Sequence, residues 1–268
     1  YDQAIAEGER AIALDPNNDL SYNRQGVALS FAGRPAEALP MMEQAMRLNP
    51  HYPPFYLGDL GWTYFLIGRY AEAVATLKEA TSRGPTLMVY YPMLANSSVQ
   101  QWASQQGADS QTLEQALAAA QRGLALNDAY PAGYLALGSA YLWQKQYEQA
   151  VTEMERAIAL APNETISSAR LAETLSRVDK PEDALRMVEQ TLRRKPFFVD
   201  GHLNSVGTAY YFAEKPEKAI APLKQFLSRY PNILSAHLTL AAVYSELGRQ
   251  AEARAEAAEV LRINPKFS

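Results

Sequence analysis

One alanine recurs along the chain at a nearly constant interval, and this repeat constrains the fold more than any other feature. Successive copies are 34 or 35 residues apart, apart from one gap of 43 residues: Ala4, Ala38, Ala73, Ala116, Ala150, Ala184, Ala219 and Ala253. Twelve residues after each alanine stands Pro16, Pro50, Pro85, Asp128, Pro162, Pro196, Pro231 or Pro265, so seven of the eight positions are proline. A period of this length is typical of an array in which each unit is one supersecondary structure.

The residue types at these positions predict that each unit is a pair of α-helices. Proline cannot continue a helix, because it lacks the backbone N–H, so it ends the second helix of each unit. The alanine suits a point where two helices cross closely, since a larger side chain would force them apart. A second small residue lies upstream in each first helix, at Gly26, Gly61, Ala95, Gly138, Ala172, Gly207 and Ala241. Three residues later a leucine or tyrosine usually follows on the same helical face.

This pattern resembles the tetratricopeptide repeat, a helix-turn-helix unit of 34 residues. The fourth full unit is nearly a consensus copy, with Tyr134, Leu137, Gly138, Tyr141, Tyr147, Ala150, Ala157 and Pro162 at the family's positions. The resemblance covers essentially the whole chain. It implies an all-α, right-handed superhelix (an α-solenoid) of about fifteen helices, which acts as a non-catalytic scaffold that binds other proteins or peptides.

The spacing also predicts where the units begin and end. Residues 1–18 form an unpaired second helix, since the chain opens at Tyr1 where a second helix starts, as expected for a piece of a longer protein. Seven helix pairs follow, over 19–53, 54–85, 86–130, 131–164, 165–199, 200–233 and 234–268. The unit over 86–130 is irregular. We expect a lengthened first helix that runs past Trp102, then a loop over 107–110.

Composition and motifs exclude several classes of function. The chain holds 29 acidic and 25 basic residues, a formal charge of −4, so nucleic acid is not an expected partner. It has no cysteine, and its three histidines, His51, His202 and His237, lack a metal-binding spacing. We expect His237 to lie in the core. No metal, cofactor or catalytic residue is predicted. No apolar run is long enough for membrane insertion, and a cytoplasmic location is favoured over a periplasmic one.

The resemblance implies that the first helices line a concave groove. The family's groove positions lie just before and just after the small residue of each first helix, and they select aromatic and amide side chains here. The partner-binding candidates are Asn23, Phe31, Trp62, Phe65, Asn96, Gln100, Trp143, Arg177, Asn204, Tyr211 and Phe212. Large aromatic side chains often dominate peptide interfaces, and amides can bind a peptide backbone. The alternative is that these aromatic residues are buried against one another. A lysine-based clamp for two carboxylates and a regular asparagine ladder, both known in this family, are absent.

Two further expectations concern the ends of the array and its setting. The unpaired first helix should expose Ile5, Ile12 or their neighbours, and no polar helix caps the C-terminus, so self-association through the terminal helices is predicted. The segments HYPPFYLGDLGWTYFLIGRYAEAVATLKEA (51–80) and SAHLTLAAVYSELGRQAEARAEAAEVLRINPKFS (235–268) resemble C-terminal repeat regions of bacterial adenylate cyclase-like and TolB-like regulators. This weaker resemblance implies an alternative function, an accessory regulatory or oligomerisation module that acts on its own missing N-terminal domain.

Overall fold

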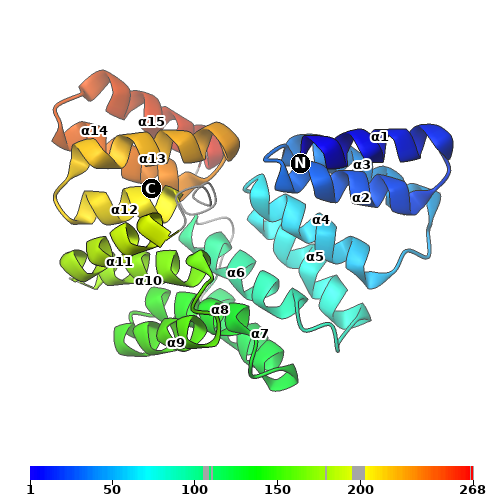
Figure 1. Cartoon of the computed structure of the whole chain (residues 1–268), viewed down its shortest axis with the longest axis horizontal. Helices are drawn as coiled ribbons and strands as arrows, with labels where there is room; N and C mark the ends of the chain where they lie inside the picture. The colour runs from blue at the N-terminus through cyan, green and yellow to red at the C-terminus, as the bar shows by residue number, and fades with distance from the viewer. Residues whose placement is uncertain (105–108, 110, 179, 195–202, 266, 268) are drawn as a thin grey trace.

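Helices are the only regular secondary structure in the described part of the chain. The computed structural model describes residues 1–104, 109, 111–178, 180–194, 203–265 and 267, and within them it contains fifteen α-helices and no strand (Figure 1). They are α1 (Asp2–Leu14), α2 (Asp19–Phe31), α3 (Pro35–Leu48), α4 (Pro54–Leu66), α5 (Tyr70–Arg83), α6 (Tyr90–Ala103), α7 (Thr112–Leu126), α8 (Pro131–Trp143), α9 (Tyr147–Leu160), α10 (Thr165–Arg177), α11 (Pro181–Arg194), α12 (Leu203–Phe212), α13 (Pro216–Arg229), α14 (Leu234–Glu246) and α15 (Gln250–Ile263). The predicted all-α solenoid is confirmed.

The helices stack as antiparallel pairs that follow one another along the array. From α2 onward each even-numbered helix packs against the odd-numbered helix that follows it, and that helix packs against the next pair. Even-numbered helices of neighbouring pairs also contact one another, as in α6 with α8 and α10 with α12. These first helices therefore form a continuous layer along the array.

The small residues lie where the helices approach most closely. The alanines of the six inner copies of the repeat, from Ala38 to Ala219, are fully buried, whereas Ala4 and Ala253 at the two ends of the array are not. A Cβ atom added at Gly61 would lie 2.6 Å from Leu77 Cγ, and one at Gly207 would lie 2.4 Å from Leu223 Cγ. No real Cβ approaches a neighbour so closely, so the packing requires glycine at both positions.

The turns inside five of the helix pairs each place one residue in a left-handed backbone conformation. Gly33, Gly68 and Gly248 have φ values of 76°, 78° and 71° in these turns. Lys145 and Glu214 occupy the equivalent turns with φ values of 61° and 55°, although they have side chains. Left-handed backbone costs a residue with a Cβ roughly 1–2 kcal/mol, so these two turns are locally strained.

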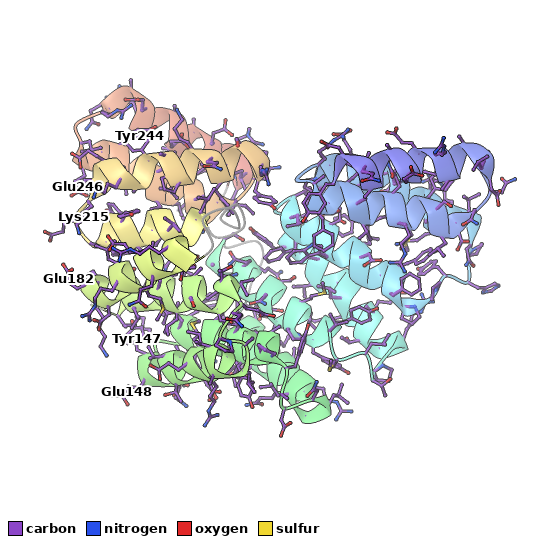
Figure 2. All side chains as sticks on the ribbon, in the orientation of Figure 1. Tyr147, Glu148, Glu182, Lys215, Tyr244 and Glu246 are labelled. Atoms are coloured by element: carbon purple, nitrogen blue, oxygen red, sulfur yellow. The ribbon has the colours of Figure 1, made fainter. Side chains whose placement is uncertain are left out.

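Charged side chains lie on the outer helices, as expected for solvated helix surfaces. The odd-numbered helices α3 to α15 each carry an acidic residue in the first turn, where it complements the helix dipole. Figure 2 shows two of these, Glu148 and Glu182, at the outer edge of the array. The outer helices therefore present charged side chains to solvent. Candidate binding residues are accordingly sought on the layer of first helices.

The irregular unit places its extra residues after its first helix. Helix α6 has 14 residues and passes Trp102 by one residue, so it is only one residue longer than α4 and α8. Most of the loop predicted over 107–110 lies outside the described residues. Within it, the Asp109 carboxylate accepts hydrogen bonds from the Gln111 backbone (3.0 Å) and from the Thr112 hydroxyl (3.2 Å), which fixes the start of α7.

The predicted exposure of Ile5 is wrong. Ile5 is buried against Leu29 and Ala38, because α1 packs on α2 with its apolar face inward. Ile12 is half-buried. The large apolar side chains that α1 leaves exposed are at its ends, Tyr1 and Leu14, and Leu14 is 82% exposed. Self-association through the terminal helices stays a prediction.

The superhelix curves far enough for its distant parts to touch. The Asn264 side chain, just after α15, donates a hydrogen bond of 2.5 Å to the carbonyl oxygen of Ser104, just after α6, and both residues are buried. The turn between α4 and α5 reaches the loop before α14, since a Cβ at Gly68 would lie 2.6 Å from the carbonyl oxygen of Asn232. We call these two contacts the closure contacts. They enclose the concave surface of the array.

Candidate binding groove

Two adjoining cavities open on the inner side of the array. The polar chamber, of about 270 Å³, is lined mainly by the first helices α6, α8, α10, α12 and α14, including Asn96, Trp143, Arg177, Asn204 and Thr239. The aromatic chamber, of about 230 Å³, is lined by Trp62 and Phe65 of α4, Ile166 of α10, Phe226 of α13 and Tyr230. The two chambers share a wall made of Tyr70, Gln100, Arg170, Glu173, Asn204 and Ser235. Together they form one groove that crosses most of the array.

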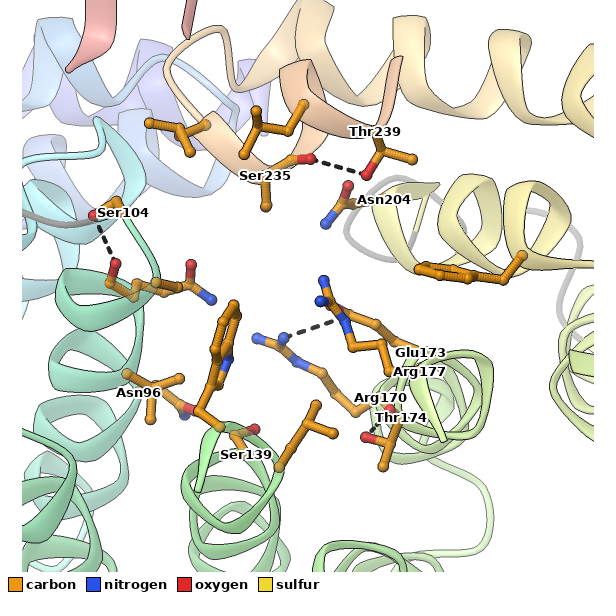
Figure 3. Close-up of a pocket in the computed structure, with 18 of the residues that line it drawn as sticks. Asn96, Ser104, Ser139, Arg170, Glu173, Thr174, Arg177, Asn204, Ser235 and Thr239 are labelled. Carbon is orange, nitrogen blue, oxygen red and sulfur yellow. Dashed lines mark hydrogen bonds and ion pairs between the residues drawn. The ribbon is translucent and has the colours of Figure 1, made fainter. Parts of the chain in front are cut away.

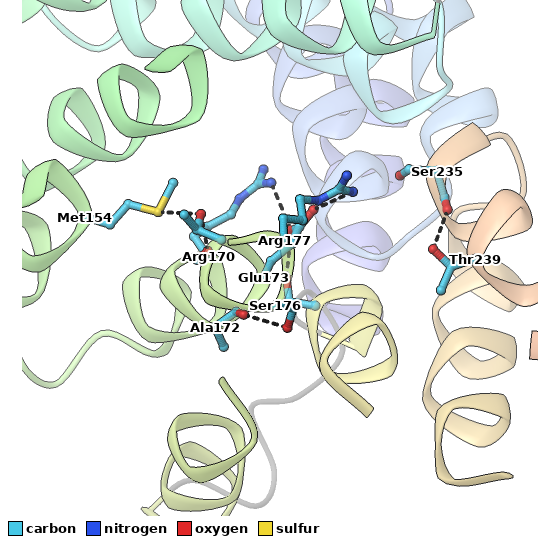
Figure 4. Close-up of polar contacts among 10 residues, drawn as sticks. Met154, Arg170, Ala172, Glu173, Ser176, Arg177, Ser235 and Thr239 are labelled. Carbon is cyan, nitrogen blue, oxygen red and sulfur yellow. Dashed lines mark hydrogen bonds and ion pairs between the residues drawn. The ribbon is translucent and has the colours of Figure 1, made fainter. Parts of the chain in front are cut away.

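A charged triad on α10 forms the floor of the polar chamber. Arg170, Glu173 and Arg177 are spaced at i, i+3 and i+7, which places them on one helical face. Glu173 lies between the two arginines: its Oε2 is 3.6 Å from Arg170 Nη1, and its Oε1 is 3.6 Å from Arg177 Nη2 (Figure 4). Figure 3 shows both guanidinium groups pointing into the open chamber.

Neighbouring helices hold this triad in place. The Ser205 hydroxyl of α12 donates to Glu173 Oε2 at 3.3 Å. The Arg177 guanidinium lies over the Trp143 ring of α8, with its central carbon 5.4 Å from the ring centroid, a cation–π contact. Arg177 Nε and Asn204 Oδ1 are buried without a hydrogen-bond partner within the described structure. A buried polar atom that lacks a partner is uncommon in a folded protein, so both side chains keep unused hydrogen-bonding capacity beside the polar chamber.

The shared wall also carries a buried phenol. Burial raises the pKa of Tyr70, and the nearby Arg170 charge lowers it by a smaller amount. The hydroxyl therefore stays neutral at physiological pH. Tyr70 contributes a rigid, uncharged surface between the two chambers.

Stacked rings line the aromatic chamber. The Trp62 and Phe65 rings stack with their centroids 5.0 Å apart, and Phe65 meets Tyr70 edge to face at 5.6 Å. Phe226 and Tyr230 lie opposite, with their ring centroids 5.1 Å apart. The chamber thus joins α4 to α13, which are adjacent only because the superhelix closes.

Nine of the eleven residues predicted to line the groove do line the chambers. Trp62 and Phe65 line the aromatic chamber; Asn96, Gln100, Trp143, Arg177, Asn204, Tyr211 and Phe212 line the polar chamber. Asn23 is fully buried and Phe31, at the end of α2, is 53% exposed; neither lines a chamber. The aromatic side chains in the chambers are half-buried for the most part, and Phe212 is 39% exposed, so they are packed on one side and open on the other.

The sequence prediction omitted several lining residues. Arg170 and the α14 residues Leu238, Thr239 and Ala242 follow the same offset from the small residue, so the signal was present. Phe226 and Tyr230 lie at the end of a second helix, which the offset rule assigns to the outer layer. They reach the groove only through the curvature of the whole array.

Other candidate chemistry is accounted for by packing. His237 lies in the core, as predicted, with Nδ1 2.6 Å from Glu256 Oε2 and Nε2 2.9 Å from the Pro231 carbonyl oxygen. The described residues include no group of three or more His, Asp or Glu side chains placed to hold a metal ion. Within the same residues, no helix combines the length and apolar character needed to span a bilayer.

Comparison with known proteins decides the family. Four models of the tetratricopeptide repeat match the chain, over residues 8–39, 32–90, 131–164 and 207–266. The chain is a tetratricopeptide-repeat protein. Tetratricopeptide-repeat proteins are generally non-catalytic, and their fold is that of a protein–protein interaction scaffold.

Curated relatives match parts of this tetratricopeptide-repeat protein. The BBSome complex member BBS4 homolog of Drosophila melanogaster is 25% identical over 198 residues, which is 69% of this chain and 39% of that protein. The small glutamine-rich tetratricopeptide repeat-containing protein 2 of Mycosarcoma maydis is 31% identical over 100 residues, or 37% of this chain and 28% of that protein. The chain therefore spans less than half the length of either relative.

Solved tetratricopeptide-repeat structures share the fold. A thermophilic tetratricopeptide-repeat protein of Thermus thermophilus is 25% identical, with a TM-score of 0.63 over 71% of this chain and 98% of that one. The APC/C hetero-tetramer Cut9–Hcn1 has a TM-score of 0.65 at 17% identity, over 98% of this chain and 50% of that one. The weaker resemblance to adenylate cyclase-like and TolB-like regulators stays a prediction.

Proposed function

We propose that this tetratricopeptide-repeat protein binds an extended peptide segment of a partner protein in the groove formed by the polar and aromatic chambers. The observation that carries the proposal is the continuity of the two chambers, which are lined by first helices of successive pairs from α4 to α14. An extended chain fits such a groove because its side chains point alternately to opposite sides and can enter both chambers.

The lining chemistry supports a peptide as the ligand. Half-buried aromatic residues such as Trp62 and Trp143 offer large, rigid contact surfaces that lose little rotamer entropy on binding. The unpartnered Asn204 Oδ1 can accept a hydrogen bond from a peptide N–H. Binding therefore combines apolar contact with recognition of the peptide backbone.

We also propose that the groove binds its partner without chemical reaction. Neither chamber is lined by a histidine, lysine or cysteine among the described residues, so no serine hydroxyl there has a neighbouring base of that kind. The Ser104 and Ser139 hydroxyls donate instead to helix carbonyl groups four residues earlier. The site is organised for binding.

Site-specific photo-crosslinking tests the location of the peptide. The photoreactive residue p-benzoylphenylalanine replaces Phe212, which borders the polar chamber, or Phe31, which is more exposed but lies outside both chambers. Proteins captured from the native cell extract are then identified by mass spectrometry. We expect a partner protein that crosslinks at position 212 and not at position 31.

Substitution of the lining aromatics provides the second readout. Trp62→Ala and Trp143→Ala should each reduce recovery of that partner, and the thermal melt should show that both variants are folded. Unchanged recovery with both variants, or crosslinking at position 31 alone, would remove the groove as the binding site.

A further inference from the structure

The groove is charged at one place, and this feature points to the chemistry of its ligand. We propose that the polar chamber recognises an acidic side chain of the bound peptide: the carboxylate binds Arg177 and the Asn204 amide, while an adjacent apolar side chain enters the aromatic chamber. This inference rests on the proposed peptide-binding function and specifies which peptides the groove selects.

The local charge differs in sign from that of the whole protein. The charged residues among the described lining of both chambers are Arg170, Glu173 and Arg177, which leaves one excess positive charge in a chain whose formal charge is −4. The three side chains are between 14% and 31% exposed, so water screens this charge less than it screens a surface charge. An anionic group is therefore the complementary ligand.

The arginines of the triad do not use their full hydrogen-bonding capacity within the protein. Elsewhere in the chain the same i,i+3 spacing gives a two-pronged pair: Arg34 donates from Nε and Nη2 to the two Glu37 oxygens at 2.7 and 2.6 Å. In the groove, one carboxylate lies between two guanidinium groups at 3.6 Å, beyond hydrogen-bonding distance. Two guanidinium groups share the single Glu173 carboxylate, so guanidinium N–H groups remain that can donate to the carboxylate of a ligand.

Arg177 is held in position to receive that carboxylate. Its guanidinium lies on the Trp143 ring, which restrains the planar group, and its Nε is buried without a partner. Figure 3 shows the Asn204 side chain pointing from α12 into the same space. A carboxylate between them would accept two hydrogen bonds from arginine and one from the amide, the pattern that planar guanidinium groups recognise well.

A basic ligand does not fit this arrangement. The one acidic group, Glu173, is flanked by two guanidinium groups and already accepts a hydrogen bond from Ser205. A lysine that approached Glu173 would be repelled by both arginines. The groove therefore favours acidic over amide side chains, and amide over basic ones.

The adjoining aromatic chamber sets the second requirement. Arg170, Glu173 and Asn204 line both chambers. A carboxylate bound in the polar chamber is therefore separated from Trp62 and Phe65 only by these shared lining residues. A leucine or phenylalanine near the acidic residue can reach that apolar surface. The predicted ligand is a short segment in which an acidic and a large apolar residue are close neighbours.

A library of matched peptides tests the inference. The probes are N-acetylated, C-amidated decapeptides labelled with fluorescein. One central position is Glu, Gln or Lys, and the flanking positions are drawn from Ala, Ser, Leu and Phe. Fluorescence anisotropy gives the dissociation constant of each peptide for the full chain. We expect the best Glu peptide to bind about tenfold more tightly than its Gln twin, since a charge-assisted hydrogen bond is stronger than a neutral one.

Three variants assign that preference to the triad. Arg177→Gln should abolish the Glu-over-Gln preference, whereas Arg156→Gln, which makes the same charge change at an exposed site on α9, should leave it intact. Glu173→Gln removes the internal competitor for both arginines, so it should increase the preference. A merely structural role for Glu173 cannot produce tighter binding.

The possible outcomes separate this inference from the proposed function. Equal binding of Glu and Gln peptides that still depends on Trp143 would overturn acidic recognition and leave peptide binding intact. Preference for Lys peptides, or a preference that survives Arg177→Gln in the folded variant, would overturn it as well. Absence of binding by every peptide would overturn both proposals.

Discussion

Asp59 offers a direct test of the electrostatics of the inner layer. This carboxyl group lies on α4, largely buried, and burial raises its pKa from 3.8 to about 6. The neighbouring Asn23 and Arg24 side chains lower the pKa by smaller amounts, although Asn23 makes no hydrogen bond of normal geometry. At physiological pH the folded protein therefore holds a charge that would be better hydrated in the unfolded chain. We predict that Asp59→Asn stabilises the protein at pH 7.5.

The sign and size of this stabilisation follow from the linkage between proton binding and folding. Between pH 3.8 and about 6 the folded state binds more protons at Asp59 than the unfolded state does, so the free energy of unfolding falls as the pH rises through this interval. A difference of about two pKa units corresponds to roughly 3 kcal/mol. Asparagine has nearly the same shape and no charge. We expect a gain of about 2–3 kcal/mol at pH 7.5 and only about 0.5 kcal/mol at pH 4, where Asp59 is neutral in the folded state and about half ionised in the unfolded state.

Urea denaturation of both proteins at pH 7.5 and pH 4, followed by circular dichroism, measures the difference. Asp128→Asn, at an exposed position on the turn before α8, is the matched control and should change little at either pH. Hydrogen exchange of α2 to α5 would show whether the gain is local, because repeat arrays can unfold in segments. A variant that is no more stable at pH 7.5, or that gains equally at both pH values, would refute the reasoning.

Four further substitutions test the turns and the closure contacts. Gly68→Ala and Gly248→Ala impose the same backbone strain, roughly 1–2 kcal/mol, but only the Cβ at position 68 meets the Asn232 carbonyl. Gly68→Ala should therefore lower the urea midpoint further than Gly248→Ala and increase the radius of gyration in X-ray scattering. Equal effects of the two substitutions would argue against closure. Asn264→Ala removes the hydrogen bond to the buried Ser104 carbonyl and should lower the free energy of unfolding by about 1–3 kcal/mol. Hydrogen exchange at the end of α6 should become faster. Unchanged exchange there would show that the contact is not maintained in solution. Lys145→Gly relieves a left-handed turn and should stabilise the protein by about 0.5 kcal/mol in thermal melts, and a loss of stability would contradict the assigned strain.

The helices and their packing could be predicted from the sequence because the repeat encodes local geometry. Gly61 and Ala73 occupy fixed offsets, and each offset determines which face of a helix meets its neighbour. The same rule placed Trp143 and Asn204 on the inner layer, where the polar chamber lies. Such predictions require only the period of the helix and the length of the unit.

The composition of the groove depends on more than local offsets. Phe226 enters the aromatic chamber because small rotations between pairs add up from α4 to α13, and no single position encodes that sum. Asn23 obeys the inner-face rule yet is fully buried, lying beside Asp59 of the next first helix. The depth of the groove at each pair depends on how closely adjacent first helices approach, which the repeat pattern does not specify.

The hydrogen bond between Asn264 and Ser104 has a kinetic consequence. A long peptide can enter the groove of an open solenoid from the side at any time. It can enter a solenoid closed by contacts between distant helices only after those contacts have broken. For such a ligand the association rate should level off at high concentration, at the rate with which α15 separates from α6. Loss of the Asn264 side chain would then speed both entry and escape, so that the residence time of a bound peptide shortens even where no residue that touches the peptide has changed.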